Sequence, residues 1–184
     1  RRPEIEAHAS RVAEALRRLG ERPTPPASEP SPLPRVLESL HRDFDPRRGG
    51  FGPAPKFPPH AALRLILDHY ERTRDPGLLP LFRRTLDGMA LGGIRDHLGG
   101  GFHRYSTDSD WFLPHFEKML YDNALLIRAC AQAFTLTGDD LYRQAAVEAC
   151  EWVLRDMTHP QGAFFSALDA DSEGLLLLTD DGKL

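Results

Sequence analysis

Three histidines and several carboxylates gather in a glycine-rich part of the chain, and these residue types perform acid–base chemistry. Residues 92–123 read GGIRDHLGGGFHRYSTDSDWFLPHFEKMLYDN, where glycines alternate with aromatic and ionisable side chains. Glycine lets the backbone approach other groups closely and take conformations closed to other residues. Such a composition does not build a core, and it predicts a polar concave surface that holds a site.

His103 follows three glycines and stands beside Arg104 and Tyr105. A histidine next to an arginine in a glycine-framed loop can act as an acid, a base or a partner of a developing oxyanion. The alternative is a loop histidine that only hydrogen-bonds the backbone. The sequence leaves both interpretations open.

His115 and Glu117 stand at the start of a helix predicted over residues 115–136. The helix dipole disfavours a protonated histidine at this end, so His115 would stay neutral and serve as a base or donor. Glu117 in a first turn is favoured electrostatically even without a function. His115, Lys118 and Asp122 would share one helical face. We interpret that face as a cavity wall, with a solvated surface as the alternative.

The third group is the sequence DADSEG at residues 169–174. Alternating carboxylates suggest calcium, but the spaced oxygens and closing Glu of an EF-hand loop do not follow. General acid or base work by Asp169 or Asp171 is favoured instead. Sugar chemistry often places two carboxyl groups on opposite sides of the ring, roughly 5 to 9 Å apart.

The predicted site thus combines acid–base groups with polar and aromatic neighbours, and it includes no metal and no cofactor. Its catalytic candidates are His103, His115, Glu117, Asp169 and Asp171. Its substrate-binding candidates are Lys56, Arg104, Tyr105, Asp108, Trp111, Lys118, Tyr121, Asp122 and Asn123. Lys56 belongs to a proline-rich loop whose simpler interpretation is structural.

Helical periodicity predicts the elements that position these loops. The predicted helices cover residues 5–19, a short stretch near 36–40, 61–71, 76–90, 115–136 and 141–156. Asp75 is expected to cap the fourth of these, with Pro76 in its first turn. Short turns at residues 73–76 and 137–140 alternate with long loops at 43–59, 91–114 and 157–174. Helices joined by short turns pack antiparallel, so all the long loops should lie at one end.

The fold prediction is therefore all-α, with antiparallel helical hairpins that form part of an α/α toroid. Short motifs such as Gly49-Gly50-Phe51, Gly100-Gly101-Phe102 and Gly162-Ala163-Phe164 add weak internal repetition. The net charge of −4 indicates neither a nucleic-acid partner nor an anionic membrane. The sequence shows no apolar run of membrane-spanning length, so we predict a cytoplasmic protein with a small-molecule ligand.

Three blocks resemble the signatures of one family: GGFGPAPKFP, LGGGFHRYSTDSDWFLPHFEKMLYDNALL and FFSALDADSEG. They are similar to the thioredoxin-domain-containing family related to spermatogenesis-associated proteins. The resemblance implies a six-hairpin α/α toroid like that of N-acylglucosamine 2-epimerases and of glycosidases with this fold. It also implies a thioredoxin-like domain in cis, ahead of the toroid in the full-length protein.

On that resemblance we expect three parts. Residues 1–20 form a helix that follows the thioredoxin-like domain, residues 21–33 form a Pro/Ser-rich linker, and residues 34–184 form a partial toroid. The function expected by fold analogy is carbohydrate processing, of epimerase or glycoside-hydrolase type. The alternative is a non-catalytic binding or scaffold domain that accompanies a redox module.

Overall fold

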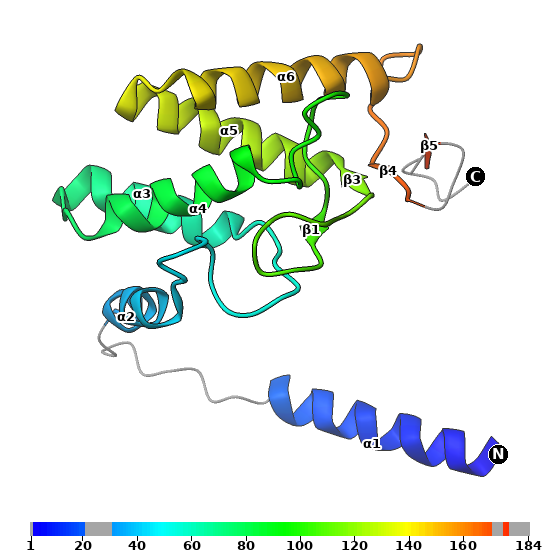
Figure 1. Cartoon of the computed structure of the whole chain (residues 1–184). Coiled ribbons are helices and arrows are strands. Elements are labelled where there is room, and N and C mark those ends of the chain that lie inside the picture. Colours follow the sequence, from blue (N-terminus) through cyan, green and yellow to red (C-terminus); the bar gives the residue numbers. More distant parts are fainter. Residues whose placement is uncertain (1, 21–30, 171–174, 177–184) are drawn as a thin grey trace. The chain divides into compact units, whose positions relative to one another are not determined.

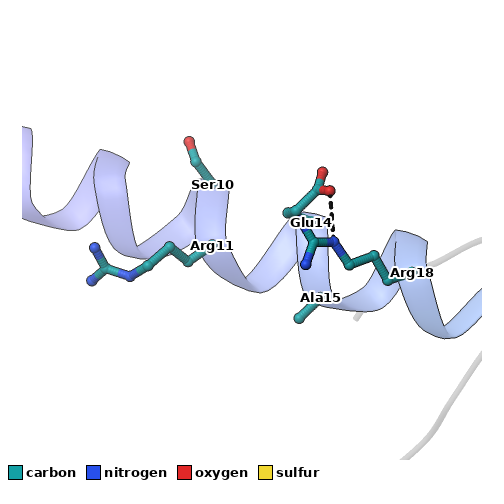
Figure 2. A pocket seen from close by; sticks show the side chains of 5 residues that line it. All are labelled: Ser10, Arg11, Glu14, Ala15 and Arg18. Atoms are coloured by element: carbon teal, nitrogen blue, oxygen red, sulfur yellow. Dashed lines mark hydrogen bonds and ion pairs between the residues drawn. The ribbon is translucent and has the colours of Figure 1, made fainter.

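The computed structural model describes residues 2–20, 31–170 and 175–176, and it divides the chain into two compact units. The first, Arg1–Pro34, contains helix α1 (Arg2–Gly20). The apolar stripe predicted for this helix is present, but Ile5, Val12 and Leu16 on it are exposed. One face of α1 carries a shallow hollow whose described lining residues all come from this helix (Figure 2): Ser10, Arg11, Glu14, Ala15 and Arg18.

The second unit, Arg35–Leu184, holds two helical hairpins preceded by a shorter helix. The shorter helix is α2 (Leu33–Asp43), and the hairpins consist of α3 (His60–Thr73) with α4 (Leu78–Leu91) and of α5 (Leu120–Thr137) with α6 (Asp140–Asp156). α3 packs against α4 and α5 against α6, while α3 also contacts α5 and α4 also contacts α6. The two hairpins therefore stack side by side in two layers (Figure 1), which confirms the predicted arrangement.

The core fills the space between these layers. Ile66 of α3, Phe82 and Leu86 of α4, Cys130 of α5 and Tyr142 of α6 are almost completely buried. The small residues Ala145 and Ala149 let α6 approach α5 closely, and close packing of this kind accounts for most helix stability in proteins.

The short turns lie where the sequence predicted them, with one difference in capping. α5 ends at Gly138, whose φ of 69° is the left-handed cap that glycine favours. α4 begins at Leu78 with Gly77 as its N-cap, not with Asp75. The Asp75 carboxylate instead accepts a hydrogen bond from the Gly77 N–H at 2.9 Å, so it stabilises the turn before the helix.

All three long connections lie at the end opposite the short turns (Figure 1), as predicted. They are joined to one another by backbone pairing. Lys56 of the first loop pairs with Ser106 of the second, and Lys118 of the second pairs with Leu168 of the third.

Within the first long loop, residues 44–51 form a tight hairpin that is closed by a lysine and a tryptophan. The Gly49 N–H donates to the Asp45 carbonyl at 2.8 Å, and the Asp45 N–H donates to the Gly50 carbonyl at 3.0 Å. Lys56 Nζ donates to the Asp45 carboxylate at 3.0 Å and to the Gly49 carbonyl at 2.8 Å. The same ammonium lies 5.6 Å from the ring centroid of Trp111. These contacts close the loop with a buried charge that is fully paired.

Within the second long loop, residues 95–102 form the same kind of hairpin. The Gly100 N–H donates to the Asp96 carbonyl and the Asp96 N–H donates to the Gly101 carbonyl, both at 2.9 Å. Lys118 Nζ donates to the Asp96 carboxylate and to the Gly100 carbonyl, both at 2.7 Å, and lies 4.9 Å from the Trp152 ring centroid. We call each such set of an aspartate, two glycines, a lysine and a tryptophan a loop lock. The weak sequence repetition is thus a structural repeat.

The glycines of the locks allow the loops to lie directly on a helix. Gly49 has a φ of 74°, and a Cβ there would come within 2.4 Å of the Arg84 carbonyl oxygen on α4. Gly100 has a φ of 82°, and its Cβ would come within 2.8 Å of the Glu148 carbonyl oxygen on α6. Both the conformation and the close approach therefore require glycine.

The third loop keeps the hairpin but changes the acid. Thr158 pairs with Phe164, and the His159 N–H donates to the Ala163 carbonyl at 2.7 Å. His159 occupies the position that Asp45 and Asp96 hold in the other two loops.

The predicted helix over residues 115–136 begins five residues later than expected, at Leu120. The preceding residues form two-residue strands: β1 (Tyr105–Ser106) pairs antiparallel with β2 (Pro114–His115), while β3 (Lys118–Met119) pairs with β4 (Ala167–Leu168), which pairs with β5 (Leu175–Leu176). The prediction that His115, Lys118 and Asp122 share a helical face is therefore wrong, and no helix dipole acts on His115 from its own element. Pairing between the loops outweighs the local helical pattern.

In the part of the chain that the structure describes, no helix is both long enough and apolar enough to cross a membrane.

Candidate functional site

The loop end of the hairpins brings His103, Arg104, Tyr105, His115 and Glu117 together. Strands β1 and β2 place Tyr105 opposite His115, and the Arg104 N–H donates to the Glu117 carbonyl at 2.7 Å. We call these five residues the loop cluster. The first three are separated from the other two in the sequence by the nine residues 106–114, and the short strands close that gap.

Glu117 is the centre of the charged part of the loop cluster. Its Oε2 accepts a hydrogen bond from the Arg104 guanidinium at 2.7 Å and lies 3.7 Å from His115 Nε2. The Glu117 side chain is 15% exposed, against 38% for both partners. A carboxylate held between a guanidinium and an imidazole can orient the imidazole and stabilise its protonated form. His115 thus has the partner that a general acid or base needs.

His103 is the buried histidine of the cluster, with 8% of its surface exposed. Burial and, to a smaller extent, the nearby Lys118 ammonium lower the pKa of His103 to about 4, against the opposing effect of Asp96. Its ring lies edge-on to Phe116, with centroids 5.2 Å apart, and its Nδ1 has no hydrogen-bond partner among the described residues. His103 is therefore neutral near pH 7, and a neutral imidazole offers an unprotonated nitrogen as a base.

Tyr105 lies between two rings. Phe57 stacks on it with centroids 4.6 Å apart, and His115 stacks on it at 4.8 Å. Phe57 is 52% exposed. The stack presents an aromatic face beside the charged groups, as ligand sites commonly do.

Five predicted substrate-binding residues are buried within the protein, and four of them, Lys56, Trp111, Lys118 and Asn123, bind to the loops. Lys56 and Lys118 sit in the loop locks, 2% and 4% exposed, and Trp111 donates its Nε1–H to the Arg48 carbonyl at 3.1 Å. Asn123 clamps Phe102, accepting from its N–H at 2.7 Å and donating to its carbonyl at 3.0 Å. Their polar groups are occupied by internal partners, which gives them the structural role that the sequence left open for Lys56 alone.

Asp108 also acts within its own loop. Burial by itself would raise the pKa of Asp108, but hydrogen bonds from the backbone N–H groups of Leu113, Phe112 and Asp110 lower it overall. The carboxylate accepts from the Leu113 N–H at 2.6 Å, so it holds the segment between β1 and β2.

Two further candidates begin α5. Tyr121 is 51% exposed, and its hydroxyl interacts with the Arg104 guanidinium. Asp122 is buried and pairs with His60, whose Nε2 lies 2.7 Å from Asp122 Oδ1. Sequence reasoning missed His60, although its position at the start of a helix after a proline-rich loop was the available signal.

The acidic block directly follows β4. β3 and β4 pair Lys118 with Leu168, and Asp169 is the next residue after this pair. Asp169 has interactions of its own. Asp171, the second predicted acid, lies outside the described residues.

No protein-family model matches the chain. Among curated proteins, it is 44% identical over 158 residues to human spermatogenesis-associated protein 20, and 42% identical to the rat protein of the same name. Each match covers 84% of this chain but only 20% of the relative. The chain thus spans about a fifth of the length of the curated relatives it matches.

Among solved structures, the chain is similar to a cellobiose 2-epimerase from Spirochaeta thermophila. The TM-score is 0.63 with 20% identity, over 82% of this chain and 43% of that one. A family 76 glycoside hydrolase from a bovine Bacteroides thetaiotaomicron strain matches with a TM-score of 0.55 and 15% identity, over 65% of this chain and 26% of that one. Likeness at this level of identity concerns the fold. The chain is therefore homologous to one segment of spermatogenesis-associated protein 20, and it folds as part of an α/α toroid of the sugar epimerase and glycoside hydrolase type.

Proposed function

We propose that the loop cluster forms part of a carbohydrate-processing site of epimerase or glycoside-hydrolase type. The observation that carries the proposal is the meeting of His103, His115 and Glu117 at the loop end of a fold shared with sugar epimerases. A buried neutral histidine beside a more exposed, carboxylate-paired one supplies two imidazoles in different environments. Such pairs are how one site runs acid and base steps together.

In this proposal His103 takes a proton from the substrate and His115 returns one, with Glu117 orienting His115. An epimerase removes the proton on the carbon next to a sugar carbonyl and restores it on the other face. Arg104 would stabilise the negative charge that develops on the carbonyl oxygen. The Phe57–Tyr105 face would hold the apolar side of the sugar ring.

A hydrolytic version of the same proposal uses carboxylates. In that version Glu117 and Asp169, which directly follows the Lys118–Leu168 pair of β3 and β4, would be the two acids flanking one glycosidic bond. Asp171 remains a candidate from sequence alone.

The test is solvent exchange. Mannose and cellobiose, the sugars named for similar folds, are incubated with the protein in D₂O, and loss of the C2 proton signal is followed by NMR. Exchange catalysed by the protein is expected, and His115→Ala should abolish it while leaving the melting temperature nearly unchanged. His69→Ala is the matched control, because His69 lies towards the short-turn end of α3. Exchange that survives His115→Ala would contradict the assignment.

The second candidate function is a scaffold or binding domain that accompanies a thioredoxin-like module. Internal pairing favours it, because the polar groups of Lys56, Lys118 and Asn123 are each hydrogen-bonded to a partner within the protein and need no ligand. In that case His115→Ala would leave sugar exchange absent in both proteins and cost about 1–3 kcal/mol of unfolding free energy, because Glu117 would lose a partner.

A further inference from the structure

A groove lined by helix residues lies apart from the loop cluster. A groove of about 330 Å³ runs between α3 and α5, with Phe82 of α4 in its floor. The other apolar lining residues are Ala61, Leu63, Leu67, Leu125 and Ala129. The polar lining residues are His60, Arg64, Arg128 and Gln132, and none of them is acidic. The volume falls within the range of small-molecule sites, about 300–1,000 Å³.

His60 is a lining residue and is held in place by an acid outside the lining. His60 Nε2 lies 2.7 Å from Asp122 Oδ1, and the two side chains are 17% and 6% exposed. Asp122 is buried and is not among the residues that line the groove. The pair therefore fixes the His60 ring at one end of the groove.

The charge of the groove is one-sided. Arg64 comes from α3 and Arg128 from α5, so the two helices that form the walls each contribute a cation. Both side chains are exposed, and Arg64 has only a long ion pair, 3.6 Å from Asp68. Two guanidinium groups with no acid among the lining residues complement an anion. The apolar floor complements a body that has an apolar face.

We propose that this groove binds a small organic anion, a carboxylate or phosphate ester carried on a body with an apolar face. Arg64 and Arg128 hold the anionic group, and Leu63, Leu67 and Phe82 contact the body. The site goes beyond the proposed function, because it uses no residue of the loop cluster and requires no turnover.

The test is a calorimetric titration of the protein with three probes: glucuronate, glucose 6-phosphate and glucose. The two acidic sugars are expected to bind saturably and more weakly as salt is raised, and glucose is the matched neutral probe. Comparison of the two anions tells a carboxylate site from a phosphate site. Equal binding of glucose, or no saturable binding of either anion at millimolar concentration, would overturn the proposal.

Variants locate the binding. Arg128→Gln should weaken the preferred anion about tenfold, equivalent to about 1.4 kcal/mol. Arg143→Gln is its control, because Arg143 is exposed on α6 outside the groove and pairs only with Asp140 at the surface. Leu125→Ala should also weaken binding, while Val147→Ala, a similarly exposed residue of α6, should not. Anion affinity unchanged by both Arg128→Gln and Leu125→Ala would place the ligand elsewhere and refute the groove. Absence of sugar exchange at the loop cluster would not affect any of these outcomes.

Discussion

At the scale of single residues, the protein separates its histidines by environment. His103 is buried against Phe116 and near the Lys118 ammonium, whereas His115 is half-exposed and beside the Glu117 carboxylate. Burial and a neighbouring cation both disfavour the imidazolium form of His103. The same residue type thus occupies two different environments within one cluster.

This difference predicts a pH dependence of stability. The pKa of His103 is about 4 in the folded protein, against an ordinary value of 6.5. Between these two values the unfolded chain binds a proton at this position and the folded chain does not, so stability falls as the pH falls through this window. We expect His103→Gln to reduce that loss between pH 7 and pH 5 by about 1–3 kcal/mol.

Urea unfolding at a series of pH values, followed by circular dichroism, measures this effect. His97→Gln serves as the control, because His97 is exposed. Identical slopes of stability against pH for His103→Gln and the unchanged protein would show that His103 does not titrate as described.

The sequence predicted the polar identity of the loop cluster but not its geometry. His103 and His115 were expected to converge with the acidic block because alternating loop lengths place their segments at one end, and the structure brings the two histidines together with Glu117. The helix predicted from residue 115 was wrong, since pairing of β2 and β3 with other loops is non-local and leaves no mark in local periodicity. The burial of Lys56 and Lys118 could not be predicted either, because nothing local tells a paired lysine from a solvated one.

At the scale of elements, the loop locks decide where the long connections rest. In each lock the loop lies on the second helix of its own hairpin, α4 for residues 44–51 and α6 for residues 95–102. The aspartate, the lysine and the tryptophan then fix the loop in that position. The loop cluster is attached to these anchored loops, so its geometry depends on them.

Substitution of the anchoring glycine should therefore cost more than its backbone conformation alone explains. Gly49→Ala introduces a Cβ 2.4 Å from the Arg84 carbonyl oxygen at a φ of 74°. Gly138→Ala meets a similar φ of 69° with no atom within 4 Å. We expect about 1–2 kcal/mol of destabilisation for Gly138→Ala and clearly more for Gly49→Ala.

Thermal or urea unfolding of both variants gives the comparison, and the difference between them isolates the cost of close approach. Equal destabilisation would mean that the loop can lift from α4 without penalty.

At the scale of the whole molecule, several large apolar side chains remain uncovered at the loop end. Phe112, Leu113 and Phe116 are 75%, 52% and 62% exposed. Stable monomers rarely present contiguous apolar patches of large size. These residues adjoin the loop cluster in sequence, so the same end of the molecule carries its charged groups and its uncovered apolar surface.

We expect this chain to self-associate through that surface. Phe112→Ser combined with Phe116→Ser should shift the sedimentation profile towards the monomer mass of 20.7 kDa. Leu154→Ser, which changes an equally exposed residue on α6, should leave the profile unaltered. A monodisperse monomer in the unchanged protein would contradict the expectation.

The loop locks also impose an order on assembly. Each lock is completed by a tryptophan that comes from farther along the chain: Trp111 closes residues 44–51, and Trp152 closes residues 95–102. During synthesis from the N-terminus, residues 44–51 emerge before Trp111, and residues 95–102 emerge before Trp152 of α6. Each loop lock therefore stays incomplete until the later segment that carries its tryptophan has been synthesised.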